Sequence, residues 1–102
     1  MLTNKDLWLI SEGNYFNEIR KTENFIEVQS RNTGHCWIIQ TVRMTGEMPV
    51  RLHHKHQRED RYYHLQQKVQ CVRSALRQIK KHDEYVLKTN QRRRREHERK
   101  TY

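Results

Sequence analysis

The sequence predicts a small α+β domain, in which an antiparallel β-sheet of three to five strands, connected as a meander, packs against a C-terminal amphipathic helix. Three observations predict this class. Residues 25–42 have the alternation and central turn of a β-hairpin, residues 69–87 have a helical apolar period, and apolar residues stop after Leu87 apart from a terminal tyrosine. With 102 residues the chain holds one domain at most. We assign that domain to residues 1–88 and a basic tail, disordered or helical, to residues 89–102.

The helix is predicted from the positions of its apolar residues. At 100° per residue, these fall within about one third of the helical circumference: Val72, Ala75, Leu76, Ile79 and Val86. The charged residues of the other side are mostly basic: Arg73, Arg77, Lys80, Lys81, Glu84 and Lys88. The segment therefore has one side to bury and one basic side to expose.

Asp83 is the exception on this helix, because it falls within the apolar stripe. A carboxylate turned toward a core must find a hydrogen-bond donor or remain in water at the helix end. We hypothesise that Asp83 pairs with a side chain of the sheet, His54 or Arg51, in which case Asp83→Ala lowers thermal stability. The alternative is an exposed acid at a fraying helix end.

The first thirteen residues admit two interpretations. Thr3 followed by Asp6 has the pattern of a capping box, which favours a short helix that ends at Gly13-Asn14. The alternative is a strand over residues 7–11 with Gly13-Asn14 as a tight turn. We favour the helix.

Alternating apolar residues predict the strands that follow. In residues 25–30 this alternation puts Ile26 and Val28 on one face, and residues 32–34 form a hairpin loop in which Gly34 supplies a positive φ. The other expected strands cover residues 15–20, 35–42, 50–54 and 61–66, with a connection at 44–48 and a polar loop at 55–60. In residues 50–54, three side chains share one side: Val50, Leu52 and His54. The sheet face away from the C-terminal helix is expected to be wet, covered by the N-terminal segment, or used for binding.

The charge is distributed unevenly. Hydrophobic residues make up only 33% of the chain, so the core is small, and the formal net charge is +9. Residues 1–50 carry five Lys/Arg and six Asp/Glu, whereas residues 51–102 carry sixteen and six. Such a one-sided positive field favours a polyanionic partner, with nucleic acid as the first candidate, although a solubilising surface would have the same composition.

The predicted nucleic-acid contacts come from the helix, the tail and the segment before the helix. Arginine pairs bidentately with phosphate, and exposed aromatic rings stack on bases. The candidates are Arg51, Lys55, Arg58, Arg61, Tyr62, Arg73, Arg77, Lys80, Lys81, Lys88, Arg92, Arg93, Arg94 and Arg95. The sequence contains no RNP motif, GXXG clamp or zinc finger, so low sequence specificity is expected.

The seven histidines raise the question of a metal site. Zinc needs three or four converging nitrogen or sulfur ligands, and on a strand His54 and His56 share a face while His53 points away. Neither HExxH nor CxxC spacing is present. We therefore predict no metal, cofactor or catalytic residue and a protein that is not an enzyme. The alternative is a metal-dependent enzyme that uses the histidine-rich region 53–64.

Two further chemistries have little support. A nuclease would need an acid from Glu59, Asp60 or Asp83, and a hydrolase would pair a histidine with Cys36 or Cys71. These cysteines fit no zinc pattern. Cys36 lies among apolar neighbours, where packing explains it.

The first twenty residues lack a signal-peptide pattern and no apolar run reaches membrane-spanning length, so we expect a cytoplasmic protein with reduced thiols and no membrane partner. The runner-up function is a protein-binding accessory or inhibitor module that acts on an acidic protein or a nucleoprotein. Composition leaves the choice of DNA or RNA and the oligomeric state open.

Overall fold

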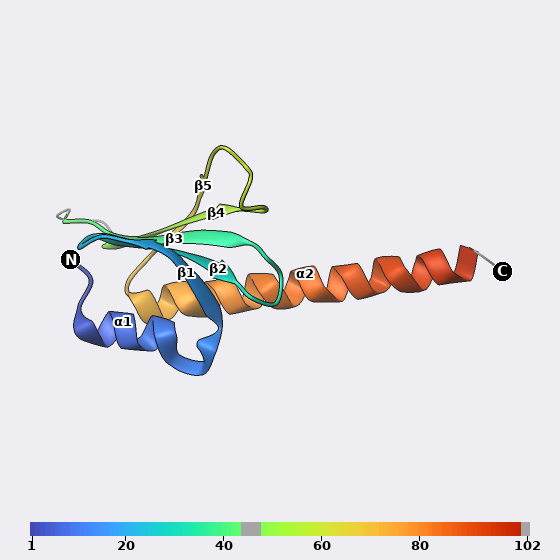
Figure 1. The fold of residues 1–102 in the computed structure, drawn as a ribbon, viewed down its shortest axis with the longest axis horizontal. Coiled ribbons are helices and arrows are strands. Elements are labelled where there is room, and N and C mark those ends of the chain that lie inside the picture. Colours follow the sequence, from blue (N-terminus) through green and yellow to red (C-terminus); the bar gives the residue numbers. More distant parts are fainter. Residues whose placement is uncertain (44–47, 101–102) are drawn as a thin grey trace.

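The computed structural model describes residues 1–43 and 48–100, and it has the predicted architecture: a five-stranded antiparallel meander with a long C-terminal helix (Figure 1). The strands are adjacent in the sheet in the order β1-β2-β3-β4-β5. In chain order the elements are α1 (Asn4–Ser11), a 3-10 helix η1 (Glu12–Asn14), β1 (Phe16–Lys21), β2 (Phe25–Ser30), β3 (Cys36–Thr41), β4 (Val50–Lys55), β5 (His64–Val69) and α2 (Val72–Lys100). Most of the connection expected at residues 44–48 lies outside the described residues.

The N-terminal segment is a helix, as we favoured over a strand. Its capping box is complete: the backbone N–H of Asp6 donates to the Thr3 hydroxyl at 3.1 Å, and the backbone N–H of Thr3 donates to the Asp6 carboxylate at 3.0 Å. The chain then leaves the helical path where Gly13 and Asn14 adopt positive φ values of 72° and 55°.

The predicted hairpin is formed by β2 and β3, with Val28 opposite Trp37. Ile26 and Val28 are buried on one face of β2, as the alternation predicted. Gly34 has a φ of 78° in the connecting loop, the left-handed conformation for which glycine was expected there.

The last strand and the start of the last helix lie further along the chain than predicted. The strand expected at residues 61–66 is β5, and the helix begins at Val72 rather than Val69. Val69 ends β5, where it pairs with Val50 and is buried. Its burial satisfies the apolar pattern of either element, so periodicity alone did not identify the boundary.

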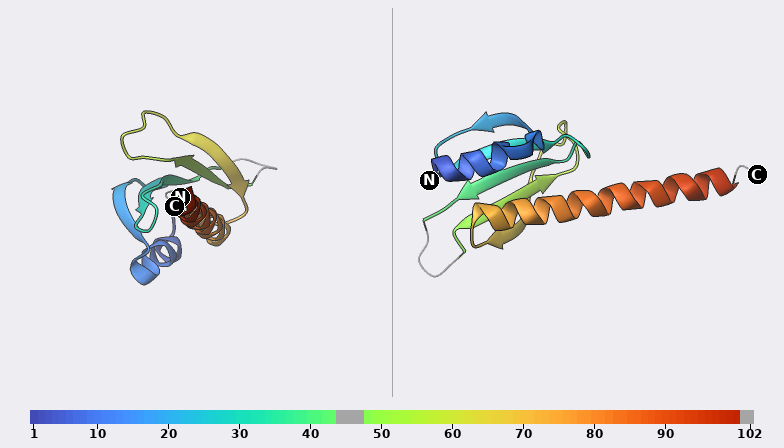
Figure 2. Two further views of the ribbon diagram at one scale, coloured as in Figure 1. Left: turned by 90° about the vertical axis from the view of Figure 1, so that its right-hand side faces the viewer. Right: turned by 90° about the horizontal axis from the view of Figure 1, so that it is seen from below.

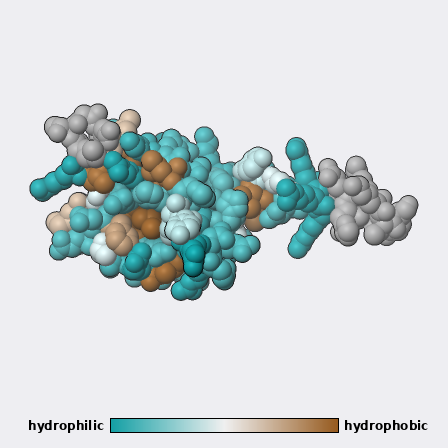
Figure 3. All heavy atoms as spheres, turned by 90° about the horizontal axis from the view of Figure 1, so that it is seen from above, coloured by the Kyte–Doolittle hydropathy of each residue, from teal (hydrophilic) through white to brown (hydrophobic). Residues whose placement is uncertain are grey.

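Both helices pack on the same face of the sheet (Figure 2). Leu2 and Ile10 from the N-terminal segment join the core of the sheet and α2, which includes Trp37, Leu52 and Ile79. The N-terminal segment therefore does not cover the opposite face, which corrects one of the alternatives considered for that face. The opposite face is mostly hydrophilic with separate apolar patches (Figure 3).

Helix α2 packs on the sheet with its first part only. The predicted apolar residues Val72, Ala75, Leu76 and Ile79 are buried, Val86 is half-buried, and burial ends at Asp83. The helix nevertheless continues to Lys100 and extends beyond the sheet (Figure 1). Of the two states expected for the tail, the helical one is therefore present as far as Lys100. No helix of the described part of the chain has both the length and the apolar character to cross a membrane.

Candidate functional site

The exposed side of α2 carries a row of cations that we call the basic stripe. At 100° per residue its members lie within about 120° of one another, and all are exposed. The stripe consists of Arg73, Arg77, Lys80, Lys81, Lys88, Arg92 and Arg95. From Arg73 to Arg95 it is about 33 Å long at 1.5 Å per residue. It is a band of positive charge along one side of the helix.

Few contacts engage the basic stripe. Its members make no ion pair with a carboxylate among the side chains that the structure describes, although the exposed Glu84 lies between them. Among the described residues, the one ring contact of the stripe places Lys80 Nζ 5.5 Å from the centroid of the Tyr15 ring. These cations are therefore hydrated and available to a ligand.

The arginines beyond the sheet add charge all around the helix. Arg92, Arg93, Arg94 and Arg95 are consecutive and exposed, so at 100° steps they cover the whole circumference. We call residues 87–100 the helical extension. Its first nine residues, up to Arg95, bury no side chain against the domain.

Two other predicted contact residues lie on the opposite face of the sheet. Arg51 is opposite Gln40 and Lys55 is opposite Cys36, in the alternation that faces away from α2. Lys55 is 9% exposed, and its ammonium donates to the backbone oxygens of Arg58 at 3.0 Å and Asp60 at 3.2 Å. Lys55 therefore holds the loop after β4 in place.

That loop carries the remaining predicted residues, Arg58, Arg61 and Tyr62, all of which are exposed. The loop leaves the sheet on the side away from α2 (Figure 2). The structure thus divides the predicted residues into two groups: those of α2 form one continuous surface, and those of residues 51–62 lie apart from it.

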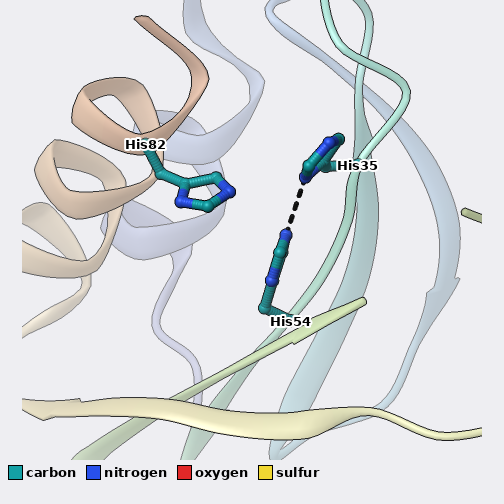
Figure 4. A group of neighbouring side chains, drawn as sticks. All are labelled: His35, His54 and His82. Atoms are coloured by element: carbon teal, nitrogen blue, oxygen red, sulfur yellow. Dashed lines mark hydrogen bonds between the residues drawn. The ribbon is translucent and has the colours of Figure 1, made fainter. Parts of the chain in front are cut away.

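A second constellation was not predicted as a unit. One nitrogen each of His35, His54 and His82 lies within 4.8 Å of those of the other two. His35 comes from the loop before β3, His54 from β4 and His82 from α2, and the three rings point toward one another (Figure 4). His35 Nδ1 and His54 Nε2 are 2.8 Å apart and share a hydrogen bond. We call these three residues the histidine cluster.

Trp37 forms one wall of the histidine cluster. Its ring centroid lies 4.2 Å from that of His54 and 5.2 Å from that of His82, the second pair being edge to face at 85°. The indole N–H donates to the Ser30 hydroxyl at 3.1 Å, and both of these residues are buried. The wall is therefore fixed by the core.

The environment of the histidine cluster favours neutral imidazoles. Burial lowers the pKa of His35 and His82 below the ordinary value, and burial together with the neighbouring histidines lowers the pKa of His54 to about 3. Near pH 7 the three rings are therefore uncharged, which is the form in which imidazole binds a metal.

Asp83 lies next to the histidine cluster and is fully buried. It accepts hydrogen bonds from the Tyr15 hydroxyl at 2.5 Å and the Thr33 hydroxyl at 2.9 Å. The expectation that a buried Asp83 finds hydrogen-bond donors is confirmed, and the alternative of an exposed acid is wrong. The hypothesised pairing with an imidazole or arginine of the sheet, His54 or Arg51, is also wrong, because the donors are the hydroxyls of Tyr15 and Thr33. In this turn of α2, His82 faces His35 and His54, whereas Asp83 faces the N-terminal segment and the hairpin loop.

Of the histidines considered from the sequence, His54 lies in the cluster, and His53 points away from it, as predicted. His53 lies on the opposite face, near Gln40, and His56 is exposed with its ring 5.0 Å from that of His35. His35 and His82 were not singled out, because no local spacing connects them. The usable signal was His54 itself, which alternates with buried Val50 and Leu52 and so had to face the core.

Comparison of the chain with protein-family models, with curated proteins and with solved structures finds no significant match.

Proposed function

We propose that the protein binds nucleic acid without catalysis, and that the phosphate backbone contacts the basic stripe of α2 and the helical extension. The observation that carries this proposal is the row of exposed cations along one side of α2, none of which makes an ion pair with a described carboxylate. Phosphate contacts of this kind carry no base information, so the proposed binding has low sequence specificity.

The dimensions support a backbone ligand. Seven cations over about 33 Å give one positive charge per ~5 Å, whereas each strand of duplex DNA presents one phosphate per ~3.4 Å. Several cations can therefore face phosphates at the same time. Neutralising four phosphates of a duplex gives a log–log salt slope of about −3.6.

The helical extension suits this role because nothing in the described domain packs on it. A helix without tertiary contacts is marginal in water, and four adjacent arginines repel one another. A polyanion that neutralises those arginines removes the repulsion. We therefore expect nucleic acid to raise the helicity of the extension.

The proposal is tested by fluorescence anisotropy with labelled single- and double-stranded oligonucleotides at several salt concentrations. The informative variant is Arg92→Gln/Arg95→Gln, which removes two charges of the stripe. The matched control is Lys5→Gln/Lys21→Gln, which removes two exposed charges from α1 and β1. Both variants have the same net charge.

If the basic stripe is the interface, Arg92→Gln/Arg95→Gln weakens binding and reduces the salt slope by about 2, whereas the control keeps the slope of the unmodified protein. Equal effects of the two variants would show that binding follows net charge alone and would overturn the assigned interface. Absence of binding at low salt would overturn the function and would favour the acidic protein partner considered from the sequence.

A further inference from the structure

We propose that His35, His54 and His82 form a binding site for a divalent transition metal, for which Zn²⁺ is the best-fitting ion. The proposal rests on the positions of three imidazole rings from three different elements, and it is independent of nucleic-acid binding.

The separations between the histidine nitrogens are close to those of a zinc site. Tetrahedral coordination with Zn–N bonds of about 2.0–2.1 Å places ligand nitrogens roughly 3.3–3.4 Å apart. The His35 Nδ1 and His54 Nε2 atoms are 2.8 Å apart, and one nitrogen from each of the three rings lies within 4.8 Å of those of the other two. Adjustments of about 0.5 to 1.5 Å, within reach of small side-chain rotations, would give the separations that this geometry requires.

The donor set selects the class of metal. Three neutral imidazoles, with no carboxylate among them, suit zinc and its transition-metal neighbours, whereas Mg²⁺ and Ca²⁺ require oxygen ligands. Three protein ligands leave the fourth position of a tetrahedral ion to water or to the exposed His56, whose ring lies 5.2 Å from that of His54.

One ring nitrogen has no other role among the described residues. The Nε2 atom of His82 is buried and has no hydrogen-bond partner there. A polar atom without a partner is costly inside a protein, and packing of the three histidines alone does not offset this cost. Binding of a metal ion between the rings would offset it.

Neighbouring residues hold the three rings in place. In metal sites, such residues fix the orientation of the ligands. Asp83, adjacent to His82, accepts from Thr33, and the same Thr33 hydroxyl accepts the backbone N–H of His35 at 3.2 Å. The contact between Asp83 and Thr33 therefore fixes the loop that carries His35 against the helix turn that carries His82. Trp37 packs against His54 and His82 from the core.

Isothermal titration calorimetry with ZnCl₂ tests the proposal on the full chain after dialysis against a chelator and then against buffer. The informative variant is His82→Gln, which removes one ligand from the surface of α2. The matched control is His53→Gln, which removes the adjacent imidazole of β4 from the opposite face of the sheet. Far-UV circular dichroism verifies that each metal-free variant is folded.

We expect the unmodified protein to bind one Zn²⁺ per chain and to melt roughly 10–20 °C higher when free zinc is about 100 times its Kd. Loss of residues that merely support metal ligands costs 10–100-fold in affinity, so His82→Gln should weaken binding at least about 100-fold. His53→Gln should stay within about threefold of the unmodified protein.

Cobalt substitution adds a readout of geometry, because four-coordinate Co²⁺ absorbs visible light much more strongly than six-coordinate Co²⁺. An intense visible band that His82→Gln abolishes supports the site. Absence of stoichiometric zinc binding would overturn the proposal, and so would equal affinities of His82→Gln and His53→Gln, since binding would then belong to other histidines.

Discussion

Replacement of Asp83 tests how α2 is held on the sheet. The carboxylate is fully buried and accepts from the hydroxyls of Tyr15 and Thr33, which are 68 and 50 residues away in the sequence. It therefore joins three parts of the chain: the segment before β1, the hairpin loop and the helix. Asp83→Ala removes both hydrogen bonds and leaves two hydroxyls without their acceptor.

The expected cost follows from these two bonds. A hydrogen bond to a charged group contributes about 1.5–3 kcal/mol, and two of them give roughly 3–6 kcal/mol. Removing the carboxylate also removes the cost of burying its charge, which offsets part of this loss. We expect Asp83→Ala to lower the free energy of unfolding by about 2–3 kcal/mol, a large part of the roughly 5–15 kcal/mol typical of a domain.

Urea denaturation and thermal melts measure the effect, which corresponds to a fall in Tm of roughly 10–20 °C for a domain of this size. Glu84→Ala is the matched control, because it removes the neighbouring, exposed acid and should change stability by less than about 0.5 kcal/mol. Tyr15→Phe alone should cost about 1.5–3 kcal/mol, since it leaves the carboxylate buried with one donor fewer.

A double-mutant cycle between Tyr15→Phe and Asp83→Ala isolates the contact. Residues in direct contact couple by about 0.5–3 kcal/mol, whereas independent sites add to within about 0.5 kcal/mol. Additive effects, or an Asp83→Ala variant as stable as Glu84→Ala, would refute the assigned role of Asp83.

Three further predictions concern other parts of the fold. Tyr63→Phe should cost about 1–3 kcal/mol in urea denaturation, because the Tyr63 hydroxyl donates at 2.6 Å to Glu27, which is 8% exposed, whereas the exposed Tyr62→Phe control should have no effect. Burial and the same bond raise the pKa of Tyr63, so the stability that its neutral hydroxyl contributes below pH 10 should be lost as the pH rises above 10. Urea denaturation at several alkaline pH values checks this, and a Tyr63→Phe variant that loses as much stability at alkaline pH as the unmodified protein would contradict it. Gly34→Ala should cost about 1 kcal/mol from its positive φ alone, since the nearest atom to the added methyl is 3.9 Å away, and an unchanged urea midpoint would contradict that reasoning. A chain that ends at Asn90 should unfold within about 0.5 kcal/mol of the full chain in the same assay, because residues 91–95 bury nothing.

The parts of the fold that local rules determine could be predicted from the sequence. The capping box of Thr3, the positive φ of Gly34 and the apolar face of α2 each depend on residues a few positions apart. The start of α2 could not be placed, because burial of Val69 satisfies both a strand and a helix.

The histidine cluster could not be predicted, for a tertiary reason. Its members come from a loop, a strand and a helix, so their convergence depends on the sheet order and on where α2 crosses the sheet. Two sequence signals pointed to this region without joining it: His54 on the buried side of β4, and Asp83 within the apolar stripe of α2. A buried polar residue indicates that a partner exists, but the fold decides which partner it is.

Helix α2 connects the two proposals, because its packed part ends where its basic extension begins. Asp83 is the last fully buried residue of α2 among the described side chains, and the run of arginines begins less than three turns later, at Arg92. A metal bound to His35, His54 and His82 would therefore fasten the helix to the sheet at the base of the extension. It would stabilise the folded domain without adding a charge to the stripe surface. Zinc should thus raise Tm and leave the salt slope of nucleic-acid binding unchanged, whereas Arg92→Gln/Arg95→Gln should reduce that slope and leave zinc affinity unchanged. If each perturbation instead altered both properties, the separation of α2 into a packed base and an independent basic extension would be wrong.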